Sequence, residues 1–331
     1  MAIFVMLSAA PQLPLDWVSM HAATSVRPDW SSLPVRVRAY AEEQLGAGVT
    51  KAMTCGAGYT PGLACRLQLA DGRRAFLKGI GGDHPFAPQY RSEVEITPLI
   101  PEGVGPKVLW STAPEEGTDW WLLCLEDLPG GNPALAPGSA DTAAVIEAVE
   151  KAVKALTPAP LADAEPITKR VGSWLTGWAN LAAGPTQDLD PWAVRNLDRL
   201  VSTEPLWQAA AGGETFIHWD LRPDNFVMRA DGTAVIIDWS YPHKGAPWID
   251  PVLLIPQLIM AGHTPSEAEK AVAHLPMPSP DVLTSFAIAL CGYWEISARR
   301  TNPPGVPFLR EHQARAASIA RAWIAHRTRW A

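Results

Sequence analysis

Five polar side chains in the second half of the chain have the types and spacing of a kinase active site. They are His218, Asp220, Arg222, Asn225 and Asp238, in Phe216-Ile-His-Trp-Asp-Leu-Arg-Pro-Asp-Asn225 and Val235-Ile-Ile-Asp-Trp239. An aspartate in a tight loop can hold a substrate hydroxyl, and an asparagine five residues later and an aspartate after a short hairpin can both bind Mg²⁺. Phosphoryl transfer depends mostly on positioning and charge neutralisation, which these groups supply. The alternative, polar turn residues between two core strands, is disfavoured because five positions are in register.

The elements that position these residues follow from the local pattern. Residues 226–228 and 234–237 are predicted to form a small hairpin around an Ala-Asp-Gly turn, which presents Asp238 at its end. Helices are predicted for 141–156, 167–183 and 191–211 before the loop, and for 281–300 and 308–329 after it. The second part of the chain is therefore expected to be mainly helical.

The first part of the chain predicts paired strands around a glycine-rich turn. A helix is expected at 35–45, and strands at 49–54, 63–69 and 74–78. Gly56 and Gly58 lie in the turn between the first two strands, where backbone N–H groups can approach phosphates without interference from a Cβ atom. Lys78, at the predicted end of the third strand, is placed to contact phosphates.

A helix predicted at 87–97 carries two glutamates that could pair with Lys78. We choose Glu93, near the middle of the segment, over Glu95, although both could lie on a solvated face. Strands are expected at 107–110 and 120–125, followed by a Pro/Gly-rich break at 126–131 whose backbone is free to bond a purine edge. This break is the predicted boundary between two lobes.

Together these elements predict an α+β, two-lobed fold with an antiparallel β-sheet N-lobe and a mainly helical C-lobe. The expected organisation is a loose extension at 1–30, a nucleotide-binding N-lobe at 31–128 and a catalytic, acceptor-binding C-lobe at 129–331.

The net charge of −7 argues against nucleic acid as a partner, and no apolar run approaches the ~20 residues of a membrane span. The first ten residues lack a basic region, so a cytoplasmic protein is expected. The four cysteines are expected to be reduced thiols.

At residues 45–330 the chain resembles the aminoglycoside phosphotransferase family, a branch of the protein-kinase-like fold. His218-Trp-Asp-Leu-Arg-Pro-Asp-Asn225 resembles the family's catalytic loop, Ile237-Asp-Trp239 its metal-binding strand end, and Trp121-Leu-Leu-Cys-Leu-Glu-Asp-Leu-Pro-Gly130 its hinge. The resemblance implies ATP or GTP as phosphate donor, Mg²⁺ as cofactor and a small hydroxylated molecule as acceptor.

The resemblance also implies a role for each matching residue. The implied roles are Asp220 as catalytic base, Asn225 and Asp238 as Mg²⁺ ligands, Lys78 as a phosphate contact with Glu93 behind it, and the backbone of Leu125 and Asp127 as purine contacts. Asp250 resembles a structural aspartate that holds the catalytic loop.

Two further positions in this loop, Arg222 and His218, are interpreted separately. Arg222 could neutralise charge on the transferring phosphoryl group as a second catalytic residue, or it could simply pair with Asp224. His218 is expected to support the loop rather than act chemically.

The acceptor is expected to be a small molecule. Only eleven residues separate Asp238 from Asp250, too few for the activation segment and peptide platform of a protein kinase. Residues 241–331 hold 6 acidic and 9 basic residues, and this positive balance argues against a polycationic aminoglycoside. Four carboxylates in this segment could still bind ammonium groups: Asp250, Glu267, Glu269 and Glu295. Some of the 15 tryptophans could line a flat acceptor site, with Trp239 and Trp248 favoured by their positions.

The leading hypothesis is therefore a small-molecule O-phosphotransferase acting on an antibiotic or similar natural product, which would confer antibiotic resistance. One alternative is a housekeeping metabolite kinase for a sugar, an amino alcohol or homoserine. Another is a nucleotide-binding pseudokinase, which the presence of Lys78, Asp220, Asn225 and Asp238 disfavours.

Overall fold

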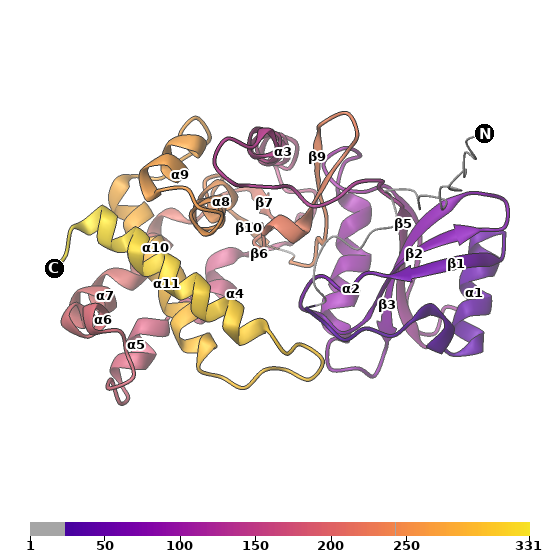
Figure 1. The fold of residues 1–331 in the computed structure, drawn as a ribbon, viewed down its shortest axis with the longest axis horizontal. Coiled ribbons are helices and arrows are strands. Elements are labelled where there is room, and N and C mark those ends of the chain that lie inside the picture. The colour runs from indigo at the N-terminus through magenta and orange to yellow at the C-terminus, as the bar shows by residue number, and fades with distance from the viewer. Residues whose placement is uncertain (1–23, 242) are drawn as a thin grey trace, which may run out of the picture.

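The chain folds into a sheet lobe and a helical lobe (Figure 1). The structure is a computed structural model that describes residues 24–241 and 243–331, so residues 1–23 of the predicted extension lie outside the described part. The sheet lobe lies at the indigo and purple end of the ribbon, and the pink to yellow helices form the other lobe. This confirms the predicted α+β fold with an antiparallel sheet in the first lobe.

The sheet has five antiparallel strands in the order β1-β2-β3-β5-β4. Its strands are β1 (Val49–Thr54), β2 (Leu63–Leu69), β3 (Arg74–Gly81), β4 (Val108–Thr112) and β5 (Trp120–Glu126). β3 continues three residues beyond its predicted end, because its pairing with β5 extends to Gly81. Lys78 therefore lies inside a strand, and not at its end as predicted.

Two helices cover opposite faces of the sheet. α1 (Val35–Leu45) follows Pro34 and ends at Gly46, whose φ of 70° closes the helix in the left-handed conformation. Its buried face packs with Leu77 of β3. Because side chains alternate along a strand, Lys78 and Ile80 face the other side. There α2 (Ala87–Ile96) packs Tyr90 against Ile80.

The helical lobe contains the remaining helices and two small sheets. The helices are α3 (Ala140–Ala155), α4 (Ile167–Trp174), α5 (Gly177–Ala182), α6 (Pro191–Arg195), α7 (Leu197–Thr203), α8 (Ile249–Met260), α9 (Pro265–Val272), α10 (Pro280–Ala298) and α11 (Leu309–Thr328). β6 (Glu165–Pro166), β10 (His243–Gly245) and β7 (Thr215–Ile217) form one sheet, and β8 (Phe226–Met228) and β9 (Ala234–Ile236) form the predicted hairpin. None of the described helices is long and apolar enough to cross a membrane.

Two predicted helices are broken in the structure. The helix expected at 167–183 divides into α4 and α5, because Gly177 brings the α5 backbone against the carbonyl of Gly292 in α10. The helix expected at 191–211 divides into α6, α7 and a 3₁₀ segment at Glu204–Ala210. At the first break Asn196 turns its side-chain amide to the carbonyls of Trp192 and Ala331. Tertiary contacts thus override the local helical pattern.

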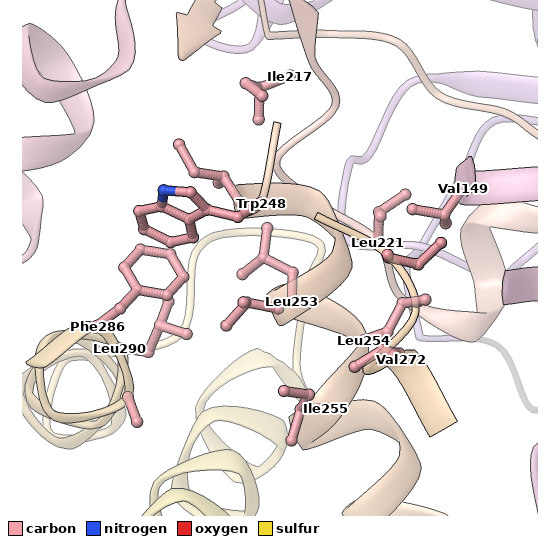
Figure 2. Close-up of a cluster of buried hydrophobic side chains, with 14 of the residues drawn as sticks. Val149, Ile217, Leu221, Trp248, Leu253, Leu254, Ile255, Val272, Phe286 and Leu290 are labelled. Atoms are coloured by element: carbon pink, nitrogen blue, oxygen red, sulfur yellow. The ribbon is translucent and has the colours of Figure 1, made fainter. Parts of the chain in front are cut away.

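α8 passes through the centre of the helical lobe, which the sequence did not predict as a helix. Its residues 249–259 are all buried, so its sequence has no polar face to give a helical period. Figure 2 shows Leu253, Leu254 and Ile255 of α8 among side chains from other elements. Trp248, just before α8, meets Phe286 of α10 edge to face at 5.1 Å between ring centroids.

The connection after α2 joins the two lobes by packing. Ile96, Ile100 and Val104 belong to the buried core of the helical lobe, although they precede β4 and β5 in the sequence. The N–H of Ile236 in β9 donates to the carbonyl of Val104. The boundary proposed at residues 128/129 stays a prediction.

The close approach of α5 and α10 gives a stability prediction. A Cβ atom at Gly177 would overlap the backbone of Gly292, so we expect Gly177→Ala to lower the free energy of unfolding by about 1–3 kcal/mol. Gly212→Ala is the control, because a Cβ atom there meets nothing within 4 Å. Chemical denaturation of both variants measures the difference, and equal stabilities would contradict the predicted overlap.

Candidate functional site

A buried lysine links the two lobes. Nζ of Lys78 in β3 lies 2.5 Å from Oε1 of Glu93 in α2 and 2.9 Å from Oδ1 of Asp238, which follows β9 in the helical lobe. The structure thus pairs Lys78 with Glu93, whereas Glu95 pairs with Arg91 on the exposed side of α2. Three elements far apart in the sequence are held by one ammonium group.

The charges of Lys78 and Asp238 stabilise each other, whereas burial outweighs the attraction of Lys78 for Glu93 and raises the pKa of that carboxyl to about 7. Burial opposes the charge on Lys78, but Asp238 and Glu93 raise the pKa of the ammonium above its usual range. Burial likewise opposes the charge on Asp238, but Lys78 lowers the pKa of this carboxyl below its usual range. A lowered carboxyl pKa adds stability that is lost only in acid, and a raised lysine pKa adds stability that is lost only in strong base. The Lys78–Asp238 pair therefore stays charged from about pH 4 to pH 10.

The catalytic loop is held by Asp250 at the start of α8. Its Oδ2 accepts from the N–H of His218 at 2.8 Å, and its Oδ1 accepts from the N–H of Trp219 at 3.0 Å. Trp219 has a φ of 72°, a conformation that bulky side chains rarely adopt, so these bonds stabilise a strained turn. The predicted position of Asp250 behind the loop is therefore matched by two direct contacts.

His218 connects the catalytic loop to the hairpin end. Its Nε2 lies 2.9 Å from the carbonyl oxygen of Ile237, and its Nδ1 accepts from the N–H of Asp220 at 3.2 Å. Both ring nitrogens are thus engaged with the backbone, and His218 is buried. This arrangement agrees with a supporting part rather than a chemical one, and it sets Asp220 relative to Asp238.

The loop residues after His218 form a compact polar cluster. Nδ2 of Asn225 donates to Oδ2 of Asp220 at 3.1 Å and to the carbonyl of Asp220 at 2.7 Å. Arg222 lies between two carboxylates, 3.2 Å from Asp220 and 3.3 Å from Asp224, and its guanidinium lies 4.7 Å from the ring centroid of Tyr59. The predicted alternative for Arg222, an ion pair with Asp224, is thus present in the structure.

A cavity of about 170 Å³ lies between the lobes where a nucleotide is expected, and we call it the nucleotide cavity. Of the residues predicted to bind nucleotide or metal, the lining includes Gly58, Lys78, Glu93, Leu125, Asp127, Asn225 and Asp238. Gly56 is not part of the lining; its carbonyl instead accepts from the N–H groups of Thr24 and Ser25. The Asp127 carboxylate is paired with Arg66 and Arg74, which leaves its backbone for the predicted purine contact.

The donor set at the end of this cavity suits Mg²⁺. The amide nitrogen of Asn225 is directed to Asp220, so its Oδ1 is the atom able to bind a cation. Asp238 uses Oδ1 for Lys78 and Ser240, which leaves Oδ2. Residues 24–241 and 243–331 contain no cluster of three or more His, Cys, Asp or Glu side chains suited to a metal. A pair of oxygen ligands completed by phosphate oxygens and waters is the usual environment of Mg²⁺.

A second cavity of about 270 Å³ adjoins the first, and Asp238 lines both. Asp220 and Arg222 lie on its wall. Eight of the other lining residues carry rings, beside four leucines and five neutral polar residues; the rings are those of Tyr59, Phe86, Trp174, Trp219, Tyr241, Tyr293, Trp294 and His312. Asp220 and Asp238 are the only carboxylates among the described residues that line it. This cavity therefore offers flat apolar surfaces next to the predicted catalytic aspartate. We call it the acceptor cavity, after the molecule expected there.

The prediction that Trp239 and Trp248 would line the acceptor site is wrong. Both are buried in the core of the helical lobe, and Trp248 contacts Phe286 there (Figure 2). Trp239 packs against Phe216 and His218 behind the catalytic loop. Proximity in sequence placed them near the site, but their side chains face the apolar interior, where the ring area is removed from water.

Sequence reasoning missed several residues that the fold brings to the site. Tyr59 lies in the glycine-rich turn, and its ring lies 5.3 Å from that of His312 in α11. Arg27, from the predicted extension, lines the nucleotide cavity. Glycine spacing gave no indication of Tyr59, and no local pattern connects residue 27 or residue 312 with the glycine-rich turn, because these residues are far apart in the sequence.

The chain belongs to the phosphotransferase enzyme family, whose model matches residues 63–282. The match covers more than half of the chain and confirms the resemblance found in its motifs. It also confirms that the protein is a kinase. No curated protein sequence matches the chain.

Solved structures share the fold at low identity. Choline kinase LicA from Streptococcus pneumoniae has a TM-score of 0.62 and 15% identity, over 88% of this chain and 98% of that one. An aminoglycoside phosphotransferase from Alicyclobacillus acidocaldarius has a TM-score of 0.52 and 13% identity, over 97% of each chain. A thermostable mutant of aminoglycoside phosphotransferase APH(4)-Ia, in a ternary complex with ADP and hygromycin B, has a TM-score of 0.54 and 15% identity, over 87% and 99%. At this identity they establish the protein-kinase-like fold.

The contacts of Asp250 predict that it stabilises the catalytic loop. Asp250→Ala leaves the buried N–H of His218 and the partly buried N–H of Trp219 without an acceptor, so we expect the free energy of unfolding to fall by about 2 kcal/mol or more. Because the loop carries Asp220, the predicted catalytic base, the variant should also transfer phosphate at least tenfold more slowly. Asp163→Ala, an exposed aspartate, is the control. Denaturation and activity like those of the control would show that the loop does not depend on Asp250.

Proposed function

We propose that the protein transfers the γ-phosphate of ATP or GTP to a hydroxyl group of an antibiotic or similar small natural product. The observation that carries the proposal is the junction of the two cavities, where Asp220 faces the acceptor side and Asp238 lines both sides. A donor in one cavity and an acceptor in the other would meet at these two carboxylates. A cytoplasmic location, where nucleoside triphosphates are supplied, belongs to the same proposal.

Each polar residue at the junction has a part in the proposed reaction. Asp220 orients the acceptor hydroxyl and takes its proton late, since the transition state is loose. Asn225 and Asp238 would hold Mg²⁺, which supplies charge neutralisation on the phosphates when bound. Lys78 contacts the phosphates, and Glu93 holds its ammonium in place. Arg222, fixed between Asp220 and Asp224, adds positive charge beside the acceptor hydroxyl.

The charges around the acceptor cavity support an acceptor that carries few positive charges. The four carboxylates that could have served a polycationic aminoglycoside have other partners. Asp250 holds the catalytic loop, Glu267 caps α9, Glu269 pairs with Arg327 at 2.6 Å, and Glu295 pairs with Arg299 and Arg321. The remaining carboxylates at the cavity, Asp220 and Asp238, belong to the proposed catalytic group.

The aromatic lining supports a hydroxylated natural product with a flat or apolar part. Rings from several elements offer large contact areas with polar edges, a combination that suits small-molecule sites. The solved APH(4)-Ia complex with ADP and hygromycin B offers an antibiotic-bound example of this fold.

An amino alcohol kinase is the second candidate, favoured by the same rings. A quaternary or protonated amine is attracted to the faces of Trp and Tyr rings, and this attraction needs no additional carboxylate. Tyr241, Tyr293 and Trp294 lie in one cavity with Asp220, so an amino group among the rings would leave its hydroxyl near the carboxylate. The solved choline kinase LicA shares this fold.

Transfer of labelled γ-phosphate tests the proposal. Mg-ATP and Mg-GTP are offered with aminoglycosides, nucleoside and peptide antibiotics, macrolides, choline, homoserine and simple sugars. We expect label on an acceptor with at most one or two amino groups, and a 10²-fold or greater loss of kcat in Asp220→Asn, because proton-transfer catalysis contributes about 10²–10⁴ in rate. The Kd of Mg-nucleotide should change little in this variant.

The outcomes separate the functions. Label on choline would select the amino alcohol kinase, and label on a sugar or homoserine another metabolite kinase. Binding of Mg-nucleotide without transfer to any acceptor or to water would indicate a pseudokinase. Equal activity of Asp220→Asn and the unmodified protein would contradict the part given to Asp220.

The acceptor cavity gives a separate prediction. Trp294→Ala removes a ring from the acceptor cavity but not from the nucleotide cavity. We expect the KM for the acceptor to rise at least fivefold while the Kd of Mg-nucleotide stays within twofold. Steady-state kinetics and nucleotide titration measure the two constants. A parallel loss of both would show that Trp294 shapes the fold and not the acceptor site.

A further inference from the structure

A short segment before the first helix lies on the glycine-rich turn. The N–H groups of Thr24 and Ser25 donate to the carbonyl of Gly56, and their hydroxyls donate to the carbonyl of Gly58 at 2.6 and 2.5 Å. The N–H of Val26 donates to the carbonyl of Gly305, in the connection between α10 and α11. Residues 24–27, which we call the strap, therefore link the glycine-rich turn to the helical lobe.

The strap ends with Arg27, whose side chain enters the nucleotide cavity. Nη1 donates to the carbonyl of Gly62 and Nη2 to the carbonyl of Ala57, both at 2.8 Å. Nη1 also lies 3.5 Å from the hydroxyl of Tyr90 on α2, the helix that carries Glu93. The guanidinium thus lies beneath the glycine-rich turn, on the same side as Lys78 and Glu93, which line the same cavity.

Arg27 has no direct ion pair among the described residues, although Glu93, which is already paired with Lys78, lies near enough to feel its charge. Within residues 24–241 and 243–331 its guanidinium bonds only two carbonyls and the Tyr90 hydroxyl, and its Nε is buried without a hydrogen-bond partner. Arg66, the other arginine among the described residues that line this cavity, instead pairs with Asp127. A partly buried cation without a direct ion pair is costly, so an anion in the cavity would stabilise it.

Gly58 allows the guanidinium to come this close. Its φ is 90°, and a Cβ atom there would lie 3.0 Å from Nη2 of Arg27. Nη1 bonds Gly62 and contacts Tyr90, and Nη2 bonds Ala57, which leaves one N–H of Nη2 and the N–H of Nε for another ligand. A guanidinium fork of this kind matches the oxygens of a phosphate group.

We propose that Arg27 binds the phosphates of the nucleotide and that the strap holds the glycine-rich turn closed over them. The ligand is a nucleoside di- or triphosphate, so the proposal rests on the proposed function. Arg27 approaches the phosphates from the glycine-rich turn, while Lys78 approaches from β3. The strap also donates a hydrogen bond to Gly305 of the helical lobe. The glycine-rich turn, closed over the nucleotide, is therefore tied to that lobe as well.

Binding of nucleotide and nucleoside to Arg27 variants tests this proposal. The unmodified protein is first titrated calorimetrically with Mg-ATP, adenosine, Mg-GTP and guanosine, each separately. The nucleotide that binds and its nucleoside are then titrated into Arg27→Gln and Arg27→Lys. We expect Arg27→Gln to weaken Mg-nucleotide binding at least tenfold and nucleoside binding less than twofold, because the nucleoside has no phosphate. Arg27→Lys, which retains a charge without the fork, should fall between. Arg36→Gln, an exposed arginine of α1, is the matched control.

Each other outcome overturns the proposal. Equal weakening of nucleotide and nucleoside in both variants would mean that Arg27 only shapes the glycine-rich turn. Nucleotide binding unchanged from the Arg36→Gln control would mean that Arg27 does not contact phosphate. If the unmodified protein binds neither nucleotide, the proposed function fails together with this proposal. Thermal unfolding without nucleotide shows whether each variant is folded. If Arg27→Gln is not folded, the comparison is made with Arg27→Lys.

Discussion

The arrangement of the site depends on the buried ammonium group of Lys78. It bonds Glu93 on one side and Asp238 on the other, and so joins β3, α2 and the end of the β8–β9 hairpin. A buried charge without partners would be costly, whereas two carboxylates make the charged state the favoured one. The two lobes are thereby held so that the residues of the nucleotide cavity, which come from both lobes, face one another.

Most charged side chains around this group form ion pairs or hydrogen bonds within the protein, and many of the side chains at the neighbouring cavity are aromatic. Asp250 fixes the strained turn at Trp219, and Arg222 is held by Asp220 and Asp224. Away from the junction, Glu269 and Glu295 pair with arginines of the helical lobe. The acceptor cavity is lined by rings, leucines and neutral polar side chains, with Arg222 and the carboxylates of Asp220 and Asp238 at one place on its wall. Its recognition of an acceptor would thus rely more on shape and ring contacts than on opposite charge.

Much of the site was predictable because it occupies short stretches of sequence. His218, Asp220 and Asn225 lie within eight residues, so the loop that carries them also fixes their relative positions. The pairing of β8 with β9 then brings Asp238 to the same place, as a hairpin turn requires. The sheet strands were predicted for a similar reason, since alternation and turn residues act over a few positions. The buried helix α8 was not predicted, because a helix surrounded by apolar neighbours has no polar face to mark its period.

The sequence alone thus determined the class of enzyme, the α+β fold and the residues proposed for phosphoryl transfer, because these follow from local spacing and from motifs shared by the family. Tertiary structure decided which residues surround them. It placed Trp248 in the core, Trp294 in the acceptor cavity and Arg27 in the nucleotide cavity. Side chains far apart in sequence meet only when both lobes pack, and burial of apolar area together with pairing of buried charges selects the contacts that form.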